Sequence, residues 1–194
     1  MRAVRRSELL DLAAYERSRG ELRAAVIEEK RKRRVHVAGV LTFLFENTAT
    51  MRYQIQEMIR AERMTKEPDI LHELETYNEL LGKKGELGCA LLIEIDDPAR
   101  RDAKLREWLL LPKHLYLVTA SGKRVPATYD PRQVGSDRLS SVQYLKFDVK
   151  GEAPVALGSD LPGLALEVAL TPEQRAALEE DLGGGGRNRP PPRP

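Results

Sequence analysis

The sequence predicts an α+β fold, in which helices pack on a mainly antiparallel, mixed sheet and the N-terminal segment is helical. The chain has 194 residues, of which 41% are hydrophobic and 32% charged, and this composition suits a globular protein with a sizeable core. Helical and strand patterns are intermixed without the regular rhythm of a doubly wound sheet. Short turns between the later strands favour antiparallel pairing.

Six elements are expected in the first half of the chain. Ser7 can cap a helix, and Gly20 is expected to separate that helix from the next one. Asn47 or Thr48 can cap a later helix, and Pro68 suits the first turn of another. In order, the expected elements are helices 7–15 and 21–34, strands 35–38 and 40–46, and helices 50–63 and 68–81.

The second half is richer in strands. Asp97 and Pro98 indicate a helix start, and Thr171 followed by Pro172 indicates another. The turn 121–123 joins two extended runs and predicts a hairpin. The expected strands are 89–95, 115–120, 124–128, 141–149 and 164–170. Residues 1–182 are predicted to form a single domain, and residues 183–194 a disordered Gly/Pro/Arg tail.

Charge and cysteine content restrict the possible functions. The net charge of +2 combines basic ends with an acidic middle, which argues against a broad nucleic-acid-binding face. The single cysteine, Cys89, lies in an apolar run, so no thiolate-bound metal centre can be built from this chain alone. No apolar run has the length of a membrane span, and acidic residues interrupt the N-terminal region. We therefore expect a cytoplasmic protein, and no cofactor is predicted.

A polar stripe follows the helix expected over 50–63. The polar stripe lies beside an apolar stripe of the same helix, which is expected to pack on the sheet. The residues of the apolar stripe are Met51, Ile55, Met58 and Ile59. The polar residues could line a cleft, with Glu57 as an acid, base or ligand and the arginines as anion-binding groups. They could equally form a solvated face held by i, i+4 pairs. The candidate cleft residues are Arg52, Gln54, Gln56, Glu57 and Arg60.

The stretch 54–58, Gln-Ile-Gln-Glu-Met, also resembles the signature of a bacterial family of proteins catalogued as domain of unknown function 3501. The likeness covers nearly all of the chain that we expect to be ordered, including the segments 9–12, 140–147, 154–158 and 172–173. The resemblance implies gene neighbours that are rubrerythrin-like or heterodisulfide-reductase-like iron–sulfur proteins, and therefore a redox or oxidative-stress context. It implies no catalytic residue.

Two further groups of residues have a functional interpretation. A basic patch of Lys30, Arg31, Lys32, Arg33 and Arg34 could contact phosphates, although a charged helix end explains it equally and no aromatic residues are interleaved. The spacing of Asp69 and His72 resembles that of di-iron helix bundles, and Glu57 could add a ligand, but one such pair is a weak signal. No metal site is predicted, and nucleic acid is not a favoured partner.

Three functions follow from the sequence. The first is an accessory or interaction protein that works with an iron–sulfur or rubrerythrin-like redox partner. The second is a small-ligand binder or enzyme that uses the polar cleft. The third is a weak nucleic-acid binder through residues 30–34.

Overall fold

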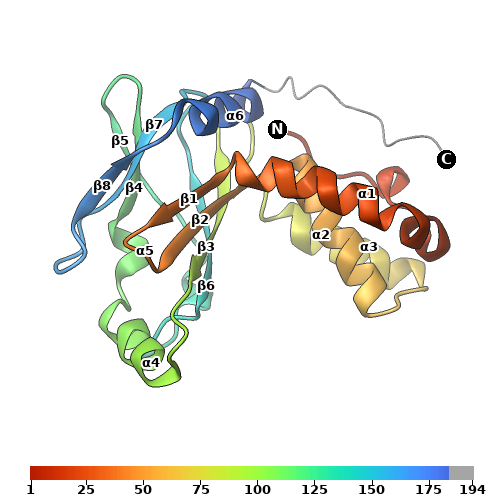
Figure 1. Ribbon diagram of the computed structural model, residues 1–194, viewed down its shortest axis with the longest axis horizontal. Coiled ribbons are helices and arrows are strands. Elements are labelled where there is room, and N and C mark those ends of the chain that lie inside the picture. Colours follow the sequence, from red (N-terminus) through yellow and green to blue (C-terminus); the bar gives the residue numbers. More distant parts are fainter. Residues whose placement is uncertain (184–194) are drawn as a thin grey trace.

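A computed structural model describes residues 1–183 and confirms the α+β class and the helical N-terminal segment (Figure 1). Residues 184–194, where the sequence predicts a disordered tail, lie outside the described residues. The helices are η1 (Arg6–Glu8), α1 (Leu12–Arg31), α2 (Thr48–Ala61), α3 (Glu67–Asn78), α4 (Pro98–Glu107), α5 (Leu111–His114), η2 (Pro131–Gln133) and α6 (Pro172–Leu182). The strands are β1 (Arg34–Val37), β2 (Leu41–Glu46), β3 (Leu87–Ile93), β4 (Leu115–Thr119), β5 (Arg124–Pro126), β6 (Val142–Phe147), β7 (Pro154–Ser159) and β8 (Leu166–Ala169).

The strands divide between two four-stranded sheets rather than forming one. The first has the order β1-β2-β3-β6 and the second β5-β4-β7-β8, and every neighbouring pair is antiparallel. Apolar residues of both sheets form one core cluster, to which α4, α5 and α6 contribute. Figure 1 shows this two-sheet half of the molecule beside a helical half made of α1, α2 and α3.

Most of the residues expected to begin helices do so. Asn47 caps α2, where its side chain accepts hydrogen bonds from the backbone N–H groups of Ala49 and Thr50 at 2.9 Å. Asp97 and Thr171 cap α4 and α6. Strand β2 is apolar and buried along nearly its whole length, which is typical of a strand covered on both faces.

The expected break at Gly20 is wrong, because α1 runs unbroken from Leu12 to Arg31. Its N-cap is Asp11, whose side chain accepts from the Ala14 backbone N–H at 2.8 Å, and not Ser7. A glycine within a helix costs about 1 kcal/mol relative to alanine. Burial of Tyr15 before Gly20 and of Val26 after it outweighs this cost.

The apolar face of α2 does not pack on the sheet, which corrects a second expectation. Met51, Ile55 and Ile59 form a separate core cluster with Ile70 and Leu74 of α3. The N-terminal strap, residues 1–10, lies over the same helices and adds Val4 and Leu9 to this cluster. The opposite side of α2 contacts α1, so α2 is sandwiched between two helices.

Strand β7 and the short helix α5 were not predicted. Strand β7 contains Pro154, Ala156 and Gly158, which have little preference for extended structure. At Gly158 an added Cβ would lie 2.4 Å from the ring of Tyr116 on β4, so any other residue there would force this ring to move. Within residues 1–183 no helix combines the length and the apolar character needed to cross a membrane.

Candidate functional site

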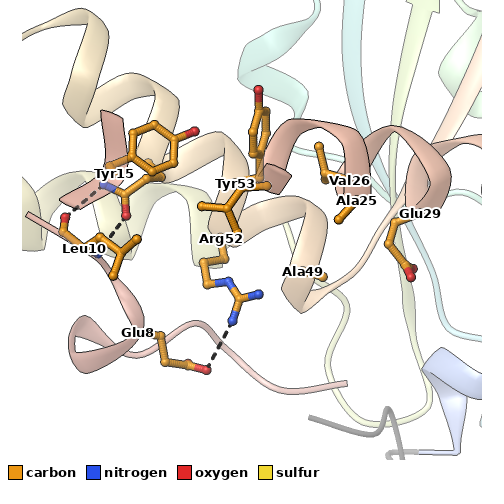
Figure 2. A pocket seen from close by; sticks show the side chains of 11 residues that line it. Glu8, Leu10, Tyr15, Ala25, Val26, Glu29, Ala49, Arg52 and Tyr53 are labelled. Atoms are coloured by element: carbon orange, nitrogen blue, oxygen red, sulfur yellow. Dashed lines mark hydrogen bonds and ion pairs between the residues drawn. The ribbon is translucent and has the colours of Figure 1, made fainter. Parts of the chain in front are cut away.

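A pocket of about 90 Å³ lies between α1, α2 and the N-terminal strap (Figure 2). Its charged and amide-bearing lining residues are Glu8, Glu29, Arg52 and Gln56. Most of the exposed lining is apolar and comes from Leu10, Tyr15, Leu22, Ala25, Val26, Ala49 and Tyr53. Apolar walls with a few convergent polar groups are typical of small-molecule sites.

Glu57 does not face this pocket but joins α2 to α1. Its carboxylate accepts two hydrogen bonds from Arg19, at 2.7 and 2.9 Å, and one from the Tyr15 hydroxyl at 2.6 Å. The bonds from Arg19 lower the pKa of Glu57 to about 2. A carboxylate held in this way stays ionised near neutral pH and is a poor general base.

The other polar stripe residues also bind neighbouring elements. The side-chain amide of Gln56, which is buried, makes two bonds with the Leu10 backbone, accepting from its N–H at 2.9 Å and donating to its carbonyl at 3.0 Å. The Arg60 Nε donates to Glu16 at 2.6 Å. Gln54 is half-buried and makes no side-chain hydrogen bond with the other described residues. Most of the stripe is therefore an interface between α2, α1 and the strap.

Arg52 is the charged stripe residue that lines the pocket. Its guanidinium lines the pocket, and its nearest carboxylate is that of Glu8, 4.0 Å away. Glu8 is already engaged, because it accepts from Arg2 at 2.6 and 2.7 Å and from the Arg5 backbone N–H at 2.9 Å. Among the described residues, Arg52 donates no hydrogen bond. Figure 2 shows its guanidinium directed toward Glu8 on the strap.

The far end of the pocket is fixed by a buried ion-pair network. Glu29 accepts from Arg33 at 2.6 Å. Arg33 also donates to both carboxylate oxygens of Asp181 on α6, at 2.7 and 3.0 Å, and both of these side chains are buried. The wall that contains Glu29 is thus tied to the C-terminal helix and to the two-sheet half of the molecule.

The same network divides the basic patch. Helix α1 ends at Arg31, so the five cations are spread over a helix end, a turn and the start of β1. Arg31 pairs with Glu28 and Glu173, and Arg33 is directed inward. Lys30, Lys32 and Arg34 form no ion pair with other described residues. The structure therefore leaves three cations of the patch, rather than five, for a phosphate-bearing partner.

The residues considered for metal or thiol chemistry do not converge. Cys89 is buried in the main core, and burial raises the pKa of its thiol. Asp69 and His72 are exposed on α3, whereas Glu57 is paired with Arg19. Within residues 1–183 no three His, Cys, Asp or Glu side chains are grouped so that they could hold a metal ion.

Sequence reasoning found Arg52 and Gln56 but missed the other pocket residues. Leu22 and Ala25 lie on α1, 30 and 27 positions before Arg52, so the pattern along either helix gives no sign that they meet it. Glu8 lies within the first expected helix, 7–15, and was not considered for the site. The signal that could have linked these residues is the pairing of α1 with α2, which no local pattern shows.

The fold and this site define an α+β protein with a helical N-terminal segment and a small, mostly apolar pocket. The family described as "Protein of unknown function (DUF3501)" matches residues 3–182, and the chain belongs to it. No curated protein matches the chain. The chain is similar to a solved structure from Burkholderia pseudomallei K96243, described as a novel protein of unknown function. The two share 28% identity and a TM-score of 0.85, over 93% of this chain and 100% of the other.

The ion pairs of the helical half predict a specific sensitivity to acid. The Glu57 pKa is lowered to about 2 by Arg19, and that of Glu8 to about 2 by Arg2. Because both folded-state pKa values lie below the unfolded ones, the stabilisation is complete above about pH 4.5 and is lost as the pH falls toward 2. Glu57→Gln should lower the free energy of unfolding at pH 7 by about 1–2 kcal/mol, a value discounted for partial solvent exposure.

Urea unfolding of the wild type and Glu57→Gln at pH 7 and pH 3 measures this effect. The stability difference between the two proteins should shrink at pH 3. Glu21→Gln on α1 is the control, because Glu21 is exposed and forms no ion pair with other described residues. A Glu57→Gln protein as stable as the wild type at pH 7 would show that Glu57 is only a solvated surface residue.

Proposed function

We propose that this protein binds a small molecule in the pocket between α1, α2 and the N-terminal strap. The observation that carries this proposal is the Arg52 guanidinium, which lines an otherwise mostly apolar pocket and donates no hydrogen bond to the described residues. Its one ion pair, with Glu8, spans 4.0 Å, whereas guanidinium groups that leave water are usually hydrogen-bonded, so Arg52 has donors left for a ligand. A ligand with a polar end would complete this arrangement.

The surroundings of the pocket support binding more than acid–base catalysis. Glu57, the residue that the sequence singles out for proton transfer, is directed at Arg19 and Tyr15 instead. Glu8 and Glu29, the two carboxylates in the lining, are held by Arg2 and Arg33. With its acidic groups occupied in this way, the pocket offers shape, apolar surface and one cation.

Filling the pocket from its rim tests the proposal. Ala25→Phe places an aromatic ring at a position that lines the pocket and is exposed at the surface, so we expect the fold to tolerate it. The probes are monocarboxylic acids, alcohols and amines of two to eight carbons, with the shift in melting temperature as the readout. At least one probe should stabilise the wild type and not stabilise Ala25→Phe.

Ala24→Phe is the matched control, because Ala24 is also exposed on α1 but does not line the pocket. It should respond to the probe as the wild type does. If no probe stabilises the wild type, or if both variants respond equally, the pocket is not a binding site for molecules of this size.

We also propose, as a second function, an association with an iron–sulfur or rubrerythrin-like partner in the cytoplasm. Its support is the family resemblance, together with a sequence whose single cysteine could not hold such a centre alone. Co-purification of a tagged chain from its native host tests it, with the absorption spectrum of the eluate as the readout. Repeated recovery of the chain without an iron-containing protein would contradict this association.

A further inference from the structure

Arg52 is the group through which the pocket can bind an anion. The two carboxylates of the lining are engaged, because Glu29 accepts from Arg33 at 2.6 Å and Glu8 accepts from Arg2 at 2.6 and 2.7 Å. Arg33 is shared with Asp181, so the charges around the pocket balance and give no general excess of positive charge. Arg52 has only Glu8 at 4.0 Å, a carboxylate that it shares with two other donors, and its guanidinium donates no hydrogen bond to the described residues. The preference for an anion therefore rests on the local contact with this guanidinium.

Arg52 is accessible from the solvent. Its side chain is 25% exposed and lines the pocket together with Ala49 of the same helix. A planar guanidinium in this setting suits bidentate binding of a carboxylate.

The remaining walls set the size and polarity of the rest of the ligand. Leu22, Ala25 and Val26 present apolar groups from α1. Tyr15 presents its ring, because its hydroxyl is engaged with Glu57 at 2.6 Å. At about 90 Å³ the pocket is smaller than the apolar cavity of roughly 150 Å³ that holds benzene in another protein. The apolar body of the ligand should therefore have fewer than about six carbons.

We infer that the ligand is a short-chain monocarboxylate, whose carboxylate binds Arg52 and whose apolar body lies between α1 and α2. A monoanion fits better than a dianion such as a phosphate monoester, because the Glu8 carboxylate, 4.0 Å from Arg52, would repel the second charge. This inference rests on the proposed function, and it specifies the chemical class that the pocket selects.

Ligand-observed NMR titrations with two probes of equal carbon number, butanoate and butan-1-ol, test the inference. Butanoate should bind the wild type more tightly than the alcohol does. Arg52→Gln should weaken butanoate binding by about tenfold or more, as expected for loss of a charge-assisted pair, and leave the alcohol unchanged. Arg52→Lys should retain part of the butanoate affinity because it keeps the charge but not the planar group.

Arg23→Gln is the matched control, because Arg23 is exposed on α1 and forms no ion pair with other described residues. It should bind butanoate as the wild type does, and all variants should show the wild-type melting temperature.

Three outcomes would contradict the inference. If Ala25→Phe abolishes butanoate binding but Arg52→Gln does not change it, the pocket is a binding site but Arg52 does not bind the carboxylate. If the wild type binds the alcohol or butylamine better than butanoate, the assignment is overturned as well. If neither butanoate nor any other probe binds the wild type, both this inference and the proposed function are wrong.

Discussion

Replacing Arg33 with leucine is expected to lower the free energy of unfolding by about 3–5 kcal/mol. Arg33 and Asp181 are 3% and 6% exposed and are joined by two hydrogen bonds. Removing the guanidinium leaves the Asp181 carboxylate buried, with Asn47 at 3.4 Å as its remaining side-chain donor. An uncompensated buried charge is costly because water cannot solvate it. Urea unfolding at pH 7 measures the loss.

Two further variants separate this effect from the loss of packing. Arg33→Leu combined with Asp181→Leu removes both charges and should recover most of the stability, since apolar residues often replace a buried ion pair without loss. Arg31→Leu, two positions earlier, breaks only exposed pairs with Glu28 and Glu173, so it should lower the stability far less than Arg33→Leu does. A loss below about 1 kcal/mol for Arg33→Leu alone would refute the described role of this pair.

Ile55→Ala is the second substitution with a large expected effect, a loss of about 2–5 kcal/mol. Ile55 is fully buried in the helical cluster, among residues of α2, α3 and the N-terminal strap. The truncation removes three carbons from a closely packed site and leaves a cavity that the neighbouring helices can only partly close. Because the strap packs on the same cluster, the truncation should also loosen the packing around Val4 and Leu9.

Leu71→Ala on α3 is the matched control, because Leu71 is 39% exposed and lies outside the cluster. It should cost less than about 1 kcal/mol. Equal losses for the two truncations, measured by urea unfolding, would mean that the face of α2 that carries Ile55 is not the centre of this core.

Local chemistry was sufficient to predict many of the elements. Asn47, Asp97 and Thr171 have side-chain oxygens that satisfy the free N–H groups at a helix start, so each marks its helix in the sequence itself. The turn at 121–123, which joins the two strands of a hairpin, is likewise a short-range signal. These signals act over a few residues and do not depend on the rest of the fold.

The features that were missed depend on contacts between distant segments. Gly20 breaks no helix because Tyr15 and Val26 are buried on either side of it. Side-chain alternation indicates which face of a strand is buried but not which strand is its neighbour, so the division into two sheets could not be read from it. Strand β7 contains glycine because Tyr116 of another strand covers it.

Only part of the candidate site could be predicted, because the rest also depends on contacts between distant segments. The stripe on α2 was identified correctly as polar, but its partners Leu10, Arg19 and Glu16 are 38 to 46 positions away in the sequence. Pairing with these partners turns Gln56, Glu57 and Arg60 into an interface. Arg52 is the charged stripe residue that lines the pocket, and its nearest carboxylate, Glu8, is held by Arg2 from the distant N-terminal strap.

Residue-resolved NMR of the wild type during a titration with butanoate tests the central claim most directly, namely that the pocket between α1 and α2 is a binding site at Arg52. The claim predicts saturable changes in chemical shift at Leu22, Ala25, Ala49, Arg52 and Tyr53, which line the pocket. Residues of the second sheet, β5-β4-β7-β8, should not change. Saturable changes confined to that sheet, or no saturable change at the pocket residues, would contradict it.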